Sequence, residues 1–129
     1  MSTRRAIDTA AAPRPIGPYS QAVVAGDLVF CAGQIGLDPA TGRLVAGGAH
    51  AEAERACENL RAVLAAAELT LAAVVKTTVY LVDLADGPAV GEVYARHFPA
   101  PHPARATVQV AGLPAGARVE IDAIAVRVR

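Results

Sequence analysis

The sequence predicts one domain in which two helices cover one face of a sheet of five or six strands. Two segments carry apolar residues at spacings of three and four, which is typical of amphipathic helices. Segments that alternate or are rich in β-branched residues precede, separate and follow them, which predicts strands. At 129 residues, without a repeat or a linker, the chain has the length of a single domain.

The first two predicted strands, residues 20–25 and 28–35, form a hairpin. The dipeptide Gly-Asp at residues 26–27, between them, is typical of a tight turn. Residues 38–42 then read Asp-Pro-Ala-Thr-Gly, a surface turn in which proline presets φ and glycine accepts a positive φ. We also expect a short strand at residues 44–45.

The clearest helix covers residues 49–68. Its apolar stripe consists largely of small residues, so the helix can lie close to whatever it covers. On its other side, Glu52 with Arg55 and Glu58 with Arg61 have the spacing of ion pairs exposed to solvent.

The second half of the chain adds a strand at residues 74–82, a second helix and two further strands, at 105–110 and 119–128. Asp86 is the expected N-cap of the second helix, and Pro88 stands in its first turn, where a missing N–H does no harm. Prolines after residue 98 end that helix.

Strand alternation indicates what the sheet carries on the face without helices. In the last strand both faces are largely apolar along the middle. Two helices cannot cover both faces of such a sheet, and a large bare apolar face marks an interface. We therefore expect a homo-oligomer in which these faces meet, for which a closed ring is one solution.

Two charges stand out in these apolar strands, Arg105 and Glu120, and we assign both to the interface side of the sheet. Arginine binds a carboxylate with two parallel hydrogen bonds, and a glutamate can orient or activate a water. The residues alone leave a second interpretation open, a structural Arg–Glu salt bridge between subunits. Tyr19, just before the first strand, is either a half-buried turn residue or a hydroxyl lining a pocket.

The sequence contains little that supports a metal site, a hydrolase site or nucleic-acid binding. The three histidines do not share a face at ligand spacing, so we expect no metal site, and His97 would complement a helix dipole. Serine-hydrolase and phosphate-binding glycine motifs do not occur. A net charge of zero and 4% aromatic residues argue against nucleic-acid binding.

The expected location is the cytoplasm. No run of apolar residues is long enough to span a membrane, and residues 1–15 lack the apolar core of a secretory signal. Those residues are expected to form a flexible arm before a single domain at 16–129. Cys31 and Cys57 lie in apolar runs and are expected to be reduced core residues.

Together these segments resemble the RidA/YjgF family of reactive-intermediate deaminases, in family order, from residue 16 to residue 127. The matching stretches are Ile-Gly-Pro-Tyr-Ser-Gln-Ala (16–22), Ala-Gly-Gln-Ile-Gly (32–36), Asp-Pro-Ala-Thr-Gly (38–42), Asn-Leu (59–60), Val-Lys-Thr-Thr-Val-Tyr (75–80), Asp-Leu (83–84), Pro-Ala-Arg-Ala-Thr-Val-Gln-Val (103–110), Leu-Pro (113–114) and Val-Glu-Ile-Asp-Ala-Ile-Ala (119–125). One such stretch alone would be weak evidence for the family, but the whole set in this order is specific to it.

The resemblance implies an α+β, chorismate mutase-like fold, with a mixed sheet of about six strands and two helices on one face. It implies homotrimers whose sheets face inward as a barrel, with sites at the subunit interfaces. The implied activity is hydrolysis of enamine and imine intermediates, such as 2-aminoacrylate and 2-aminocrotonate, to 2-keto acids and ammonia. No cofactor, metal, nucleic acid or membrane is implied, and the substrate is a small carboxylate.

The resemblance also assigns roles to individual residues. Arg105 would bind the substrate carboxylate, and Glu120 would hold a water near the imine carbon. Tyr19 would line the pocket, and the backbone around Gly33 and Thr107 would supply polar contacts. Three positions depart from better-known members: Thr107 replaces a frequent cysteine, Ala32 a frequent serine, and Gly91 a frequent asparagine.

Two alternatives to the deaminase remain open. One is a non-catalytic trimeric module that binds small carboxylates and regulates partners. The other is a ribonuclease or translation inhibitor, as some family members are labelled, which the charge balance disfavours.

Overall fold

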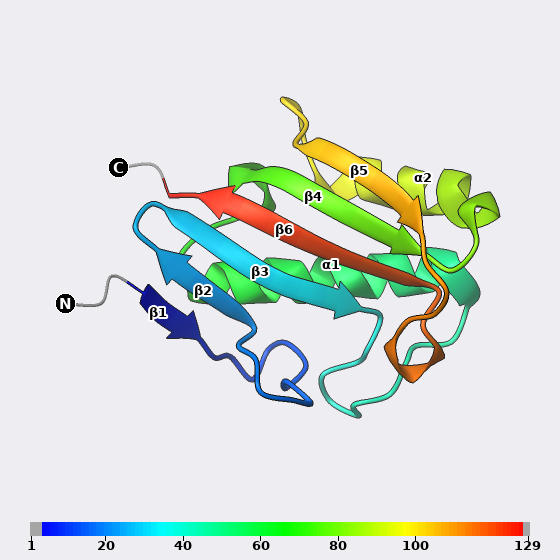
Figure 1. Ribbon diagram of the computed structural model, residues 1–129, viewed down its shortest axis with the longest axis horizontal. Coiled ribbons are helices and arrows are strands. Elements are labelled where there is room, and N and C mark those ends of the chain that lie inside the picture. Colours follow the sequence, from blue (N-terminus) through cyan, green and yellow to red (C-terminus); the bar gives the residue numbers. More distant parts are fainter. Residues whose placement is uncertain (1–3, 128–129) are drawn as a thin grey trace.

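The computed structural model describes residues 4–127, which form one six-stranded sheet with two helices packed on a single face (Figure 1). The elements are β1 (Arg4–Ile7), β2 (Ala22–Ala25), β3 (Leu28–Ile35), α1 (Gly48–Ala66), β4 (Val74–Leu81), α2 (Gly87–His97), β5 (Ala104–Gln109) and β6 (Val119–Val126), with short 3₁₀ helices at Leu71–Ala73, Leu84–Asp86 and Pro114–Gly116.

The sheet has the strand order β1-β2-β3-β6-β4-β5, and only the β4–β5 pair is parallel. The predicted hairpin is confirmed, since Ala25 pairs with Leu28 across a Gly26 that has a φ of +61°. The turn at residues 38–42 is also confirmed, and Gly42 closes it with a φ of +71°. Residues 44–45 form no strand of their own, because Leu44 makes only an isolated bridge to Leu37.

The start of the chain corrects one expectation. Residues 4–7 are not part of a flexible arm but form the edge strand β1, antiparallel to β2. The buried side chain of Gln21 holds the segment that follows, because it accepts from the Thr9 N–H and donates to the carbonyls of Thr9 and Pro13. Residues 1–3, the rest of that predicted arm, lie outside the described residues.

The core lies between the sheet and the helices. Its largest fully buried apolar side chains come from both helices, the segment after α2 and the facing strands: Phe98, Leu60, Leu64, Leu81, Ile121, Val29, Val63, Val93 and Val119. The small residues of α1 (Ala53, Ala56 and Cys57) are completely buried, which lets this helix approach the sheet closely.

Two predictions about acidic side chains of the helices need correction. Glu52 does not face solvent beside Arg55; it is buried and accepts a hydrogen bond from the Arg118 N–H at 2.7 Å, while Glu58 and Arg61 do pair. Asp86 stands at the N-cap of α2 but makes no capping hydrogen bond, and its carboxylate lies 3.9 Å from Arg118 instead.

The helix-free face of the sheet is turned toward the viewer in Figure 1. It is apolar at one end, whereas its middle carries the polar side chains of Thr78, Tyr80, Glu120 and Asp122. Cross-strand pairing puts Leu28 beside Val126 and Phe30 beside Ile124 on this face. Leu28, Phe30 and, on β5, Val108 are each about 40% exposed. The prediction that both faces of the last strand are largely apolar along the middle holds only in part, because on the helix-free face Ile124 and Val126 are apolar but Glu120 and Asp122 are acidic.

Candidate active site

Glu120 lies on the helix-free face of the sheet, directly above Gly33. The β3–β6 register shifts between Cys31 and Gln34, so Ala32 and Gly33 form a bulge opposite one residue of β6. At Gly33 a side chain would have no room, because its Cβ would lie 2.7 Å from the carboxyl carbon of Glu120. Gly33 therefore leaves the space that the Glu120 side chain occupies. Both residues were predicted to belong to the site, and the structure brings them together.

The environment of Glu120 makes its carboxylate a better base. Partial burial raises the pKa of the Glu120 carboxyl, and the nearby negative charge of Asp122 raises this pKa further. Asp122 itself is held by the Thr78 N–H and the Tyr80 hydroxyl, each at 3.0 Å. A carboxylate with a raised pKa binds the proton of a neighbouring water more strongly.

Tyr19 shares a hollow with Gly33 and Glu120, and we call these three residues the glutamate half-site. The Tyr19 side chain is 52% exposed, and its hydroxyl accepts a hydrogen bond from the Ile16 N–H. Tyr19 is therefore at the mouth of the hollow, as expected for a pocket-lining side chain. Leu37 and Pro114 are among the other residues that line it.

Arg105 lies elsewhere, and the prediction that it shares the helix-free face of the sheet with Glu120 is wrong. It stands on the edge strand β5, and its guanidinium carbon lies 4.8 Å from the centroid of the Tyr94 ring. Tyr94 belongs to α2, so Arg105 projects toward the helix side of the sheet. Thr107, two residues further, shares that side and lines the same hollow as Arg105 and Gly91.

Strand register shows that Arg105 and Glu120 face away from each other within one chain. Arg105 is the partner of Thr77 on β4, and Glu120 is the partner of Tyr80 on the other side of β4. Residues 77 and 80 are an odd number apart, so their side chains point to opposite faces. Two strand spacings and three residues of rise put the two Cα atoms roughly 14 Å apart.

We call Gly91, Tyr94, Arg105 and Thr107 the arginine half-site. Two adjoining hollows of about 450 and 230 Å³ lie against Arg105, both lined by Gly91. A Cβ on Gly91 would meet nothing within 4 Å, so the absence of a side chain there enlarges the space. The contact of Arg105 with Tyr94 could not be predicted from the sequence, because helical spacing does not reveal which strand residue lies above a ring.

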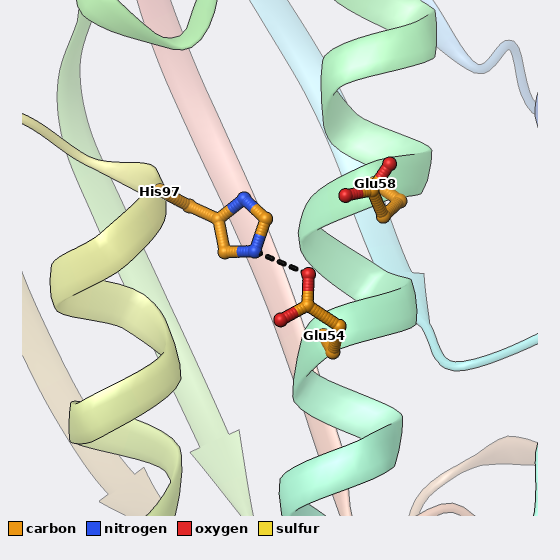
Figure 2. Close-up of side chains that lie close together, drawn as sticks. All are labelled: Glu54, Glu58 and His97. Atoms are coloured by element: carbon orange, nitrogen blue, oxygen red, sulfur yellow. Dashed lines mark hydrogen bonds and ion pairs between the residues drawn. The ribbon is translucent and has the colours of Figure 1, made fainter.

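A second polar cluster lies between the two helices (Figure 2). His97 of α2 points at Glu54 of α1, with 2.6 Å between Nε2 and the carboxylate, and Arg61 donates to Nδ1 at 3.0 Å. An arginine has only donors, so Nδ1 is the acceptor and Nε2 carries the hydrogen. The ligand atoms of Glu54, Glu58 and His97 lie within 4.8 Å of one another, a proximity that the histidine spacing did not reveal.

This cluster joins the helices rather than complementing a dipole, as His97 was expected to do. Both ring nitrogens of His97 already have protein partners, and Arg96 also lies 3.6 Å from Glu54.

Cys31 and Cys57 are free and buried, as predicted, and burial raises the pKa of each thiol to about 12. Within residues 4–127, the helices are too short or too polar to cross a membrane.

Comparison with known proteins identifies the family. The model described as Endoribonuclease L-PSP matches residues 9–127. Protein DfrA of Myxococcus xanthus is 57% identical over 125 residues, covering 95% of each chain. A human protein named 2-iminobutanoate/2-iminopropanoate deaminase is 49% identical over 124 residues, which cover 96% of this chain and 90% of that one.

A solved structure gives the same answer. RidA from Psychrobacter sp. PAMC 21119 superimposes with a TM-score of 0.91 at 45% identity, covering 95% of this chain and 98% of that one. The fold, the ordered motifs and these relatives agree over nearly the whole chain. The chain belongs to the RidA/YjgF family, whose sequence model is described as Endoribonuclease L-PSP.

Proposed function

We propose that the protein hydrolyses 2-imino acids and their enamine tautomers to 2-keto acids and ammonia, at sites formed between the protomers of a homotrimer. The name of the human relative, at 49% identity over 96% of the chain, supports this activity. Each site combines the arginine half-site of one protomer with the glutamate half-site of another.

The observation that carries the proposal is the opposite orientation of Arg105 and Glu120. A substrate of three or four carbons cannot touch two side chains that leave opposite faces of one sheet. Two protomers can bring these groups together if the edge strand β5 of one lies against the helix-free face of the next. The exposed Leu28, Phe30 and Val108 give that face the apolar area that such packing buries.

The chemistry follows from the two half-sites. Arg105 forms paired hydrogen bonds to the substrate carboxylate and so fixes the imine carbon in the site. A water held by Glu120 attacks that carbon, and the C=N electron pair passes to nitrogen while Glu120 accepts the water proton. Return of this proton to nitrogen gives a carbinolamine. Glu120 then passes the proton of the new hydroxyl to nitrogen, and the O–H electron pair forms the C=O bond as the C–N bond breaks, which releases ammonia and leaves the 2-keto acid. Positioning supplies much of the acceleration.

Two further parts of the proposal concern the setting of the reaction. The substrate is a small carboxylate that already hydrolyses in water, so the protein has only to bind and orient it together with one water molecule. We expect the protein to act in the cytoplasm. The buried free thiols of Cys31 and Cys57 are consistent with a reducing compartment.

The test generates 2-aminoacrylate with a serine dehydratase and follows its decay with and without this protein. We expect faster decay with wild type, almost none of that acceleration with Arg105→Ala, and full acceleration with Arg96→Ala. Arg96 is the matched control, since it is an arginine on α2 that pairs with Glu54 outside both half-sites. Unchanged decay with wild type would rule out the enzyme, and equal acceleration by Arg105→Ala would rule out the proposed role of Arg105.

The same preparation distinguishes the alternatives. Binding of pyruvate, the keto-acid product, without any turnover would favour a regulatory carboxylate-binding protein. RNA cleavage by a nuclease-free preparation would favour a ribonuclease instead. A monomeric mass by light scattering would contradict the proposed site, because one protomer does not join its two halves.

A further inference from the structure

We propose that Tyr94 is a positioning residue that holds the Arg105 guanidinium for the substrate carboxylate through a cation–π contact. This inference rests on the proposed function, because it concerns how the carboxylate is bound. The guanidinium carbon of Arg105 lies 4.8 Å from the centroid of the Tyr94 ring. That distance is within the range in which a ring face attracts a cation.

The contact leaves the hydrogen-bonding capacity of Arg105 available. Within residues 4–127, the Arg105 side chain forms no ion pair with a carboxylate and no hydrogen bond with another group. An aromatic face attracts the guanidinium without using any of its five N–H donors. Arg105 therefore keeps its full charge and its planar fork for a ligand, whereas a carboxylate partner would occupy both.

The Tyr94 ring is itself fixed from two sides. Its hydroxyl lies 2.7 Å from Oγ1 of Thr77, which is fully buried, and its ring stacks on Phe98 at a centroid distance of 4.3 Å. Thr77 is also the β4 neighbour of Arg105 in the parallel pair. The strand that carries the arginine and the ring beneath it are thus tied to the same residue.

The protonation state of Tyr94 supports this arrangement. Burial raises the pKa of the Tyr94 hydroxyl above its ordinary value, so the ring is neutral at physiological pH. A phenolate below Arg105 would form an ion pair with it and compete with the substrate. A neutral ring offers only the weaker attraction of its face, which orients the guanidinium and leaves its charge for the carboxylate.

The test compares Tyr94→Leu, which removes the ring, with Tyr94→Phe, which removes only the hydroxyl. Val63→Ala is the control for core truncation, because it shortens a fully buried side chain of α1 that is part of neither the Arg105–Tyr94 contact nor the Tyr94–Phe98 stack. The readouts are the Kd for pyruvate by calorimetry, kcat and KM for 2-aminoacrylate, and the melting temperature. If Tyr94→Leu does not fold, Tyr94→Met replaces it, since methionine fills the volume without a ring.

We expect Tyr94→Leu to raise the Kd and KM roughly 2- to 30-fold, the range of a cation–π contact, with kcat within about twofold of wild type. Tyr94→Phe keeps the ring and its stacking on Phe98 and should bind pyruvate like wild type, and Val63→Ala lowers the melting temperature without changing the Kd. An unchanged Kd in Tyr94→Leu, or an equal rise in Val63→Ala, would overturn the inference.

A spectroscopic readout separates this inference from the proposed function. In wild type the Arg105 side-chain protons carry a ring-current shift in their NMR spectrum, which Tyr94→Leu removes. If the shift is present and the enzyme active, but Tyr94→Leu binds pyruvate normally, the positioning role is wrong and the proposed function stands. If the shift is present but wild type neither binds pyruvate nor accelerates decay, the proposed function fails and takes this inference with it.

Discussion

Glu120 occupies the space that a side chain on Gly33 would fill. An added Cβ at Gly33 would lie 2.7 Å from the carboxyl carbon of Glu120, closer than Cβ contacts in proteins allow. The glycine stands in a β-bulge, a feature that re-aims neighbouring side chains next to active sites. The position of the proposed base thus depends on a backbone feature of the neighbouring strand β3.

The first prediction concerns that space. Gly33→Ala should displace the Glu120 carboxylate and lower kcat/KM about 100-fold, because misplacing a reacting group by about 1 Å costs that much. The stability of the fold should change little, because the atoms in the way belong to the movable Glu120 side chain rather than to backbone. Gly112→Ala is the control, since its Cβ would meet nothing within 4 Å. Equal activity of the two variants would show that the contact does not position Glu120.

The second prediction concerns pH and activity. Burial and Asp122 raise the pKa of the Glu120 carboxyl, so the base loses its charge at a higher pH than an ordinary glutamate does. A plot of kcat/KM against pH should fall on the acid side with an apparent pKa above 4.5, the ordinary value. Glu120→Gln should remove most of the activity together with this acid limb. A residual rate that keeps the limb would assign it to another group.

The third prediction concerns pH and stability. A raised pKa in the folded state means that the folded chain binds the proton more tightly than the unfolded chain, so ionisation of Glu120 opposes folding. Glu120→Gln should therefore unfold at higher urea concentration than wild type at pH 7, with the difference vanishing as pH falls below about 4. A variant less stable than wild type at pH 7 would contradict the direction of this pKa shift.

The fourth prediction concerns the segment before Tyr19. Gln21→Ala should destabilise the fold by about 2–4 kcal/mol, because it leaves the Thr9 N–H and at least two carbonyls without their buried partner. Urea unfolding measures this loss. Gln109→Ala is the control, because the Gln109 side chain accepts one exposed hydrogen bond, from the Leu84 N–H. Its loss should cost less than about 1 kcal/mol. Similar losses in both would refute the anchoring role of Gln21.

The fifth prediction concerns Gly91. This glycine lies inside α2 with open space around its missing Cβ. Gly91→Ala should stabilise the protein by about 0.5–1 kcal/mol, because alanine loses less backbone entropy on helix formation. Thermal unfolding tests this gain, and a destabilised variant would mean that another surface packs against α2 at this position.

The sequence predicted the elements better than their relation to one another. The strands, both helices and the apolar end of the helix-free face followed from local patterns of Val, Ile and Ala. The edge strand Arg4–Ile7 did not, because a four-residue strand with three exposed positions has no readable alternation. Glu52 was placed in solvent because its partner, the Arg118 N–H, lies 66 residues further along the chain.

The candidate site was predicted residue by residue but not in its arrangement. Alternation groups Arg105 with Thr107, yet it does not say which face of β5 meets the helices, and all six residues of that strand are exposed. Only the pairing of Arg105 with Thr77, and of Glu120 with Tyr80, separates the two charges. The division into two half-sites is therefore a property of the topology.

The central claim, that Arg105 and Glu120 act across an interface, is tested most directly by mixing two inactive variants. Arg105→Ala and Glu120→Gln, carrying different tags, are refolded together, and oligomers that contain both tags are detected by sequential affinity capture. Random pairing of equal amounts joins an intact Arg105 to an intact Glu120 at about one interface in four. We predict recovery of about a quarter of the wild-type rate of 2-aminoacrylate hydrolysis. Mixed oligomers no more active than the separate variants would contradict a site shared between protomers.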